Sequence, residues 1–338
     1  MSILQEDLIY IANYNLPYEK IKGCTVLVTG ATGLIGSLLV KTLLSIGNIK
    51  VLAFVRNEAK ANTIFDDEPN LQFIVGDITK VIDIQENVDY IFHCASVTNS
   101  KQMIERPVET LFTSIEGTKN ILEFATIKNV KSFVYVSSME MYGSFEKLDH
   151  EVQETDLGYI NPLNLRSNYP ESKRLCENMC IAYLAEYGVP VKIARLAQTF
   201  GAGILPGENR VFAQFARSVI NGENIILHTK GLSEGNYCYT RDCMIGLLTL
   251  LLNGQNGEAY NVSNPKSHTT IGAMADMVAN TIAKGSIKVV YDIPEGNKYG
   301  YAADTKMKLN SDKLQSLGWN PEIGLEESYR RMMQDMCK

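Results

Sequence analysis

Short apolar runs rich in β-branched residues alternate with longer segments of helical spacing over the first 200 residues. The runs predict strands at about 24–29, 50–55, 71–75, 89–93, 131–137 and 190–195. Apolar residues three and four apart predict helices between them, the longest at about 105–128 and 168–187. Strands that are apolar on both faces belong inside parallel sheets, and their alternation with helices is typical of right-handed βαβ units. The pattern predicts an α/β fold of the Rossmann type, with a doubly wound parallel sheet.

The pattern becomes irregular and richer in glycine and proline after about residue 200. Helical stretches are predicted near 208–221, 241–252, 270–283 and 324–336. We assign 1–200 to a Rossmann-type domain with an N-terminal helical extension at 1–20, and 201–338 to a smaller C-terminal α/β lobe. The two are expected to interleave in part, because the helix at 241–252 can return to the sheet. The lobe should lie over the carboxyl edge, where such sheets bind ligands.

The first predicted strand leads directly into glycines at 30, 33 and 36, followed by a segment of helical spacing. The first glycine permits a tight turn, the second lets the backbone approach a pyrophosphate at the helix N-terminus, and the third lets helix and strand pack closely. A strand before the glycines and a helix after them predict a dinucleotide site. Its expected contacts in this turn are Gly30, Thr32, Gly33, Leu34, Ile35 and Gly36.

The second predicted strand ends at Arg56 and Asn57, which favours NADP as the cofactor. An acidic residue at this place would accept the ribose hydroxyls of NAD, whereas a guanidinium suits a 2′-phosphate. NAD remains the alternative, since Arg56 could instead stack on the adenine. After the third strand, Asp77 and Ile78 are candidate adenine contacts, although Asp77 could equally cap a turn.

The ends of the fourth and sixth strands supply the remaining expected cofactor contacts. Cys94, Ala95 and Ser96 are small residues past which the backbone can approach a ligand, and Leu196 ends the sixth strand. His93 is interpreted as a packed strand residue and not as a catalyst.

Tyr169 and Lys173 are four residues apart in the predicted helix at 168–187, so they project from one face. A nearby ammonium favours the phenolate and should lower the tyrosine pKa from its ordinary ~10. The hydroxyl of Ser138, at the end of the fifth strand, could share the proton of a substrate. These groups can move a proton on and off an alcohol or carbonyl oxygen.

Charge and composition narrow the classes of partner and compartment. A net charge of −6, a pI near 5.4 and no basic block argue against nucleic acid. No apolar run approaches the ~18 residues of a membrane span, and the first residues lack a secretory signal. Seven cysteines without a CxxC pair indicate reduced thiols in a cytoplasmic protein, and four scattered histidines predict no metal site.

These segments together resemble the extended short-chain dehydrogenase/reductase family, the group of NAD-dependent epimerases and dehydratases that act on sugar nucleotides. The likeness runs from the glycine turn through Gly76-Asp77, Ser137-Ser138-Met139-Glu140-Met141-Tyr142-Gly143 and Tyr169-Pro170-Glu171-Ser172-Lys173 to Leu317-Gly318-Trp319-Asn320-Pro321. It implies that Ser138, Tyr169 and Lys173 are catalytic, with proton transfer by the tyrosine beside hydride transfer at the nicotinamide. It also implies that the lysine holds the nicotinamide ribose.

Departures from that family's patterns narrow the reaction. Dehydratase relatives carry an aspartate before the glutamate, but here Met139 precedes Glu140, and a thioether cannot protonate a leaving hydroxyl. Decarboxylase relatives carry an arginine at the place of Gly235, which weakens that interpretation and the usual grip on a diphosphate. Substrate contacts are therefore expected from Ser138, Met139, Gln198 and two possible substitutes for that arginine, Arg210 and Arg241.

The leading hypothesis is an NAD(P)-dependent epimerase of a sugar nucleotide, with Glu140 orienting a hydroxyl or acting as an auxiliary base. The alternative is an NADPH-dependent reductase of a keto-sugar nucleotide or a sugar phosphate, which Arg56 and Gly235 favour. Decarboxylation, 4,6-dehydration and a non-enzymatic sensing role rank lower. The resemblance also implies a homodimer formed by the helices near 105–128 and 168–187.

Overall fold

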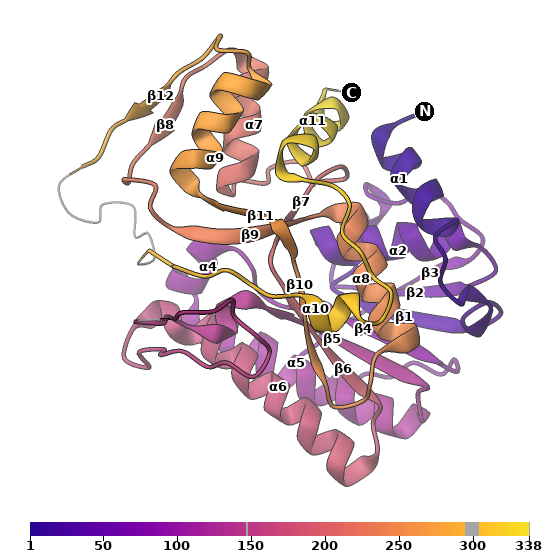
Figure 1. Cartoon of the computed structure of the whole chain (residues 1–338). Helices are drawn as coiled ribbons and strands as arrows, with labels where there is room; N and C mark the ends of the chain where they lie inside the picture. The colour runs from indigo at the N-terminus through magenta and orange to yellow at the C-terminus, as the bar shows by residue number, and fades with distance from the viewer. Residues whose placement is uncertain (147, 295–303, 338) are drawn as a thin grey trace.

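A seven-stranded parallel sheet forms the centre of the molecule (Figure 1). The computed structural model describes residues 1–146, 148–294 and 304–337. The strands follow the order β10-β6-β5-β4-β1-β2-β3 across the sheet. Their bounds are β1 Thr25–Thr29, β2 Lys50–Val55, β3 Leu71–Val75, β4 Tyr90–His93, β5 Ser132–Ser138, β6 Val191–Leu196 and β10 Ala259–Val262. The Rossmann-type fold predicted from the sequence is confirmed.

The chain reverses its direction of travel across the sheet between β1 and β4. It builds β1, β2 and β3 outward to one edge, then returns to place β4 on the other side of β1. Loops that leave these two strands in opposite directions open a crevice at their carboxyl ends, which is where open α/β sheets bind ligands. The glycine turn after β1 lies at this crevice.

Helices cover both faces of the sheet. On one face lie α2 (Leu34–Ile46) and α8 (Thr240–Asn253), whose buried leucines join a core with β1, β2 and β5. On the other lie α5 (Pro107–Lys128) and α6 (Asn168–Tyr187), which pack against each other and against the sheet. Since both faces are covered, β1, β2 and β6 are almost continuously buried, as their apolar sequences predict, whereas the edge strand β3 is partly exposed.

The C-terminal part forms a second layer above the carboxyl edge of the sheet (Figure 1). It contains the three-stranded sheet β11-β9-β7 and the pair β12-β8. The strands are β7 Gln198–Phe200, β8 Ile225–Leu227, β9 Glu234–Tyr239, β11 Asn264–Thr270 and β12 Val289–Tyr291. The helices around them are α7 Val211–Asn221, α9 Ile271–Met277 with a π-helical turn at Val278–Ile282, α10 Asp312–Gln315 and α11 Leu325–Met336.

The remaining elements are short and connect or cover these layers. They are the helices α1 Ile3–Ala12, α3 Glu58–Asn62 and α4 Ser100–Glu105, and the 3-10 turns η1 Tyr18–Lys20, η2 Met139–Tyr142 and η3 Leu165–Ser167. Helix α1 packs on α2, α8 and α11, where the buried Asp7 accepts hydrogen bonds from Tyr239 and Arg331. The N-terminal extension is therefore attached to the C-terminal helix as well as to the sheet.

All six predicted strands of the first 200 residues lie within one residue of their expected bounds. The helix expected at 105–128 differs, because Arg106 is not helical and Pro107 starts a new helix after α4. Proline disfavours a helical residue before it and suits the first helical position. Both β10 and α8 come from beyond residue 200 and belong to the central sheet and its cover. A domain boundary at residue 200 therefore separates β10 and α8 from the rest of the central sheet and its covering helices.

Candidate active site

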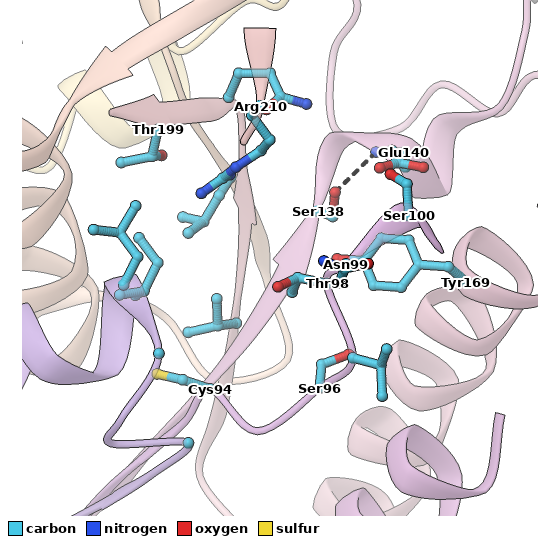
Figure 2. A pocket seen from close by; sticks show the side chains of 18 of the residues that line it. Cys94, Ser96, Thr98, Asn99, Ser100, Ser138, Glu140, Tyr169, Thr199 and Arg210 are labelled. Carbon is cyan, nitrogen blue, oxygen red and sulfur yellow. Dashed lines mark hydrogen bonds between the residues drawn. The ribbon is translucent and has the colours of Figure 1, made fainter. Parts of the chain in front are cut away.

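A cavity of about 660 Å³ runs from the glycine turn after β1 to the strands of the C-terminal layer. Figure 2 shows its middle, where side chains from the ends of β4 and β5 face Tyr169 on α6 and Arg210 before α7. The cavity lies at the β1/β4 crevice and is covered by β7 and β9.

The glycine turn fits the pyrophosphate of a dinucleotide because its backbone is left bare. Gly30 has φ +65°, and a Cβ there would lie 2.8 Å from the amide nitrogen of Ala95. A Cβ on Gly36 would press into the carbonyl of Gly30. Helix α2 begins after Gly33 without a side-chain cap, so its first amides remain available for an anion. All six residues predicted for this turn line the cavity.

The end of the cavity at β2 carries positive charge. Arg56 and Lys60 line it together with Ile78, Phe54 and Val55. In the part of the chain that the structure describes, neither cation forms an ion pair. This end is where the adenosine of a dinucleotide lies when its pyrophosphate occupies the glycine turn.

Asn57 and Asp77, two predicted cofactor contacts, act as caps and do not line the cavity. The side chain of Asn57 accepts the amide of Lys60 at 2.9 Å and caps α3. The Oδ1 of Asp77 accepts the amide and the hydroxyl of Thr79 at 3.0 and 2.9 Å. The hydrogen bond from the Thr79 amide contributes most to holding the Asp77 pKa below its usual value. Asp77 therefore caps the turn at Thr79, which was the alternative to an adenine contact.

Cys94, Ala95, Ser96 and Leu196 line the cavity, as predicted from the strand ends. The hydroxyl of Thr29 lies 2.7 Å from Nδ1 of His93 and accepts the amides of Cys94 and Ala95. Burial lowers the His93 pKa to about 3, so the imidazole is neutral at ordinary pH. His93 thus packs within the strand, as expected, and contacts the Thr29 hydroxyl that holds the turn at Cys94 and Ala95.

The predicted proton-transfer residues meet at the middle of the cavity. Ser138 ends β5, and Tyr169 and Lys173 lie one turn apart on α6. The hydroxyl of Ser138 lies close enough to the Tyr169 phenol to act against the rise of its pKa. The Lys173 ammonium donates to the carbonyl of Val136 at 2.8 Å and lies 5.7 Å from the centroid of the Tyr169 ring. Three groups separated along the sequence are therefore placed around one point.

Burial changes the expected proton affinity of this centre. It is the largest cause that raises the Tyr169 pKa, and the Glu140 carboxylate raises it further. Ser138, Arg166 and Arg210 act in the opposite direction. The lowering of this pKa expected from the sequence is therefore wrong for the protein alone, because desolvation of the phenolate outweighs the nearby cations. Burial also lowers the pKa of Lys173.

Glu140 lines the cavity from η2, the turn that follows β5. Its amide donates to the Oγ of Ser138 at 3.2 Å, the bond drawn in Figure 2. Its Oε2 accepts a hydrogen bond from Nη2 of Arg166 at 3.0 Å. The carboxylate is thus held in an ion pair. Arg166 was missed from the sequence, although its position three residues before Tyr169 was a usable signal.

The end of the cavity near β7 and β9 is lined by Met139, Gln198, Arg210 and Gly235. The guanidinium of Arg210 donates two hydrogen bonds to Glu208, at 3.0 and 2.7 Å, and lies over the Phe212 ring. A Cβ added to Gly235 would meet only Met139 Cε, at 3.7 Å. This end is therefore open at Gly235, and its arginine is partly neutralised.

Arg241 is not brought to the cavity. It donates to Asp242 at 3.2 Å and to Glu322 at 2.8 Å, and its guanidinium lies 4.0 Å from the Tyr10 ring centroid. These contacts join α8 to the N-terminal and C-terminal segments. Its predicted role in binding substrate is not supported by this position.

Several lining residues were missed from the sequence. They are polar groups from the loop after β4 and from the C-terminal layer: Thr98, Asn99, Ser100, Gln102, Ser233, Tyr237 and Thr305. The polar run 98–100 comes directly after a buried strand, and this position could have indicated that it lines a ligand site, since ligands bind at strand ends. The sequence around Thr305 contains no motif that indicates a place in the cavity.

Neither a cluster of metal ligands nor a membrane-spanning helix occurs within residues 1–146, 148–294 and 304–337. No group of three or more potential metal ligands occurs in these ranges. None of their helices is long and apolar enough to cross a membrane.

Comparisons with known proteins agree with this architecture. The family model described as the NAD dependent epimerase/dehydratase family matches residues 26–263. UDP-glucuronic acid decarboxylase 1 from Danio rerio is 29% identical over 314 residues, which cover 91% of this chain and 72% of that protein.

Solved structures share the fold at lower identity. Epimerase Mth375 from Methanothermobacter thermautotrophicus has a TM-score of 0.81 at 22% identity, with 99% of this chain and 95% of that chain covered. UDP-glucose 4-epimerase from Thermotoga maritima has a TM-score of 0.80 at 24% identity, with 93% and 98% covered. The family match, the parallel sheet and the glycine turn lead to one conclusion: the chain belongs to the NAD-dependent epimerase/dehydratase family and is an enzyme of the extended short-chain dehydrogenase/reductase type.

Proposed function

We propose that this enzyme is an NADPH-dependent reductase of a keto sugar carried on a nucleotide. The observation that supports it most is the charge at the β2 end of the cavity, where Arg56 and Lys60 lie. The carboxylates that line the cavity within the described residues, Glu140 and Glu234, come from η2 and β9 and lie away from the β2 end. Asp77 lies close enough to Arg56 to interact with it electrostatically, but it does not line the cavity and forms no ion pair with Arg56. Cations that line a cavity without a carboxylate beside them in its wall suit a ribose 2′-phosphate.

The site's own residues supply the proton chemistry of a carbonyl reduction. The dinucleotide, when bound, supplies the hydride to the carbonyl carbon. Tyr169 donates its phenolic proton to the carbonyl oxygen, and Ser138 hydrogen-bonds the same oxygen. A raised pKa keeps Tyr169 protonated over the ordinary pH range, which suits a proton donor. Lys173, held by the Val136 carbonyl, places a positive charge beside the phenolate that forms.

A sugar nucleotide is the substrate class that the relatives support. The Danio rerio relative is named for UDP-glucuronic acid, and the Thermotoga maritima structure contains UDP-glucose. Decarboxylation itself is less well supported for this chain, because Gly235 stands at the position where decarboxylase relatives carry an arginine. Because Gly235 has no side chain, Arg210 is the cation at the β7 and β9 end of the cavity that could bind the diphosphate.

Epimerisation is the second candidate, and the sequence analysis favoured it. Ser138, Tyr169 and Lys173 also suffice to oxidise and re-reduce one sugar carbon, and the open space at Gly235 gives a keto intermediate room to turn. Such an enzyme recycles its cofactor, whereas a reductase exchanges it at every turnover. A homodimer formed by α5 and α6 also remains a proposal, supported by exposed apolar residues such as Phe112 and Leu175.

Identifying the cofactor and its fate tests these candidates. The purified protein would be denatured and any released dinucleotide identified; the intact protein would then be mixed with NADPH or NADH and a panel of nucleoside-diphosphate keto sugars. We expect little retained cofactor and net oxidation of NADPH. Tightly held NAD, with interconversion of UDP-sugars and no net oxidation, would refute the reductase and support the epimerase.

Tyr169→Phe tests the assignment of the proton donor. Loss of general acid catalysis should lower kcat by roughly 10²–10⁴-fold while NADPH still binds. Binding would be followed by nicotinamide fluorescence, and folding by thermal melting. Tyr187→Phe on the exposed end of the same helix is the matched control. Retained activity in Tyr169→Phe would refute the mechanism.

A further inference from the structure

We propose that Arg166 is a positioning residue for this reaction: it holds Glu140 at the cavity wall and balances the carboxylate's charge beside the Tyr169 phenol. The inference rests on the proposed proton transfer through Tyr169. It assigns Glu140 a different role from the auxiliary base considered above, because an ion-paired carboxylate orients ligands and does not need to accept a proton.

The contacts of Arg166 place it between the two groups that it is proposed to connect. It lies in η3, where its amide donates to the side chain of Asn164 at 2.9 Å. Its Nη2 donates to Glu140 Oε2 at 3.0 Å, and its guanidinium carbon lies 5.8 Å from the centroid of the Tyr169 ring. The turn that begins α6 thus joins the acidic wall of the cavity to the proton donor.

Each member of the pair depends on the other for its charge partner. The Nη1 of Arg166 is buried and makes no hydrogen bond to a described residue, so Glu140 is the carboxylate that satisfies this guanidinium. Glu140 binds Arg166 through Oε2, while Oε1 accepts no hydrogen bond from a described residue and remains free at the cavity for a substrate hydroxyl. Removal of one partner leaves a partly buried charge uncompensated.

The charges around Tyr169 come from four elements. Glu140 on η2 acts against the phenolate, while Arg166 on η3 and Arg210 before α7 favour it. Lys173 on α6 itself lies beside the ring. Val97 and Met103 pack against Tyr169 as apolar neighbours. Without Arg166, the unbalanced Glu140 should raise the Tyr169 pKa; without Glu140, it should fall.

Four variants test this charge balance: Arg166→Gln, Arg166→Lys, Glu140→Gln and the double variant Glu140→Gln/Arg166→Gln. The readout is the ionisation of Tyr169 in the NADP⁺-bound protein, followed by the ¹³Cζ signal of labelled tyrosine between pH 7 and 11.5. Tyr169→Phe identifies that signal by its loss. This measurement requires no substrate.

Arg166→Gln should move the onset of ionisation to higher pH by about one unit, and Glu140→Gln should move it down by about as much. That size is the order expected for one uncompensated charge acting through an effective dielectric constant of ~20. The double variant and Arg166→Lys should lie close to the wild type. The alkaline limb of kcat for NADPH-dependent reduction should shift in the same order.

Arg330→Gln, which breaks the exposed Arg330–Glu326 pair on α11, is the matched control and should shift nothing. The inference would be overturned if Tyr169 ionised at the same pH in all variants. It would also be overturned if both single variants shifted this pH in the same direction while their thermal stability fell, because Arg166 would then have only a structural role. Failure of the proposed function gives a different result: the titration order would hold, but NADPH would not be oxidised or Tyr169→Phe would remain active.

Discussion

The active-site cavity has two ends that are built in different ways: the end at the glycine turn and β2, proposed to bind the cofactor (the cofactor end), and the end at β7 and β9, proposed to bind the sugar (the sugar end). The cofactor end takes its lining from short continuous segments after β1, β2 and β4, and much of it is backbone. The sugar end takes single side chains from η2, β7, β9, the segment before α7 and Thr305. Backbone shape that depends on glycines is readable from a local motif, whereas a wall of scattered side chains is assembled only by folding.

Charge divides the two ends in the same way. Arg56 and Lys60 at the cofactor end form no ion pair within the described residues, so they are available to a ligand phosphate. At the sugar end, Arg210 is paired with Glu208, and Glu140 is paired with Arg166. The cofactor end is therefore prepared to attract charge, and the sugar end to position polar groups.

The largest expected effect comes from filling the glycine turn. Gly36→Val should weaken NADPH binding by more than about 100-fold, because its side chain would displace the Gly30 carbonyl and widen the contact between α2 and β1. Fluorescence titration with NADPH would measure this. Gly324→Ala, at an open position before α11, is the control and should bind normally. Unchanged affinity in Gly36→Val would contradict the role given to the turn.

A smaller effect is expected from reversing the charge at the β2 end. Arg56→Asp should lower the NADPH/NADH preference by roughly 10- to 100-fold, the size of one or two lost charged hydrogen bonds. The ratio of kcat/KM for the two cofactors measures it. Lys22→Asp, on the exposed segment before β1, makes the same charge change away from the cavity. An unchanged ratio would remove Arg56 from the phosphate site.

The smallest effect is expected at the sugar end. Gly235→Arg adds a cation where only Met139 is near and the backbone needs no left-handed conformation. It should tighten binding of UDP several-fold at low salt, and high salt should abolish the gain. Isothermal titration of UDP would show it. Gly235→Ala separates charge from bulk; an equal gain in that variant would mean that electrostatics is not the cause.

The sequence predicted the six strands, the glycine turn and the meeting of Ser138 with Tyr169 and Lys173. It also proposed ligand contacts for Arg241, Asn57 and Asp77, which do not line the cavity. Their side chains bind Glu322, the amide of Lys60 and the amide of Thr79 instead. A polar residue at a strand end is a cap or a ligand contact depending on which partner is nearer, and spacing alone does not decide this.

What the sequence by itself determined was the backbone framework: apolar periodicity set the sheet, and glycines after β1 set the dinucleotide turn, because both depend on local geometry. Only the tertiary structure decided how the proton centre is tuned. Burial raises the Tyr169 pKa against the expectation from Lys173 alone, and Arg166 reaches Glu140 from another turn. Desolvation and charge pairing depend on the groups that surround a side chain in space, and these come from distant parts of the chain.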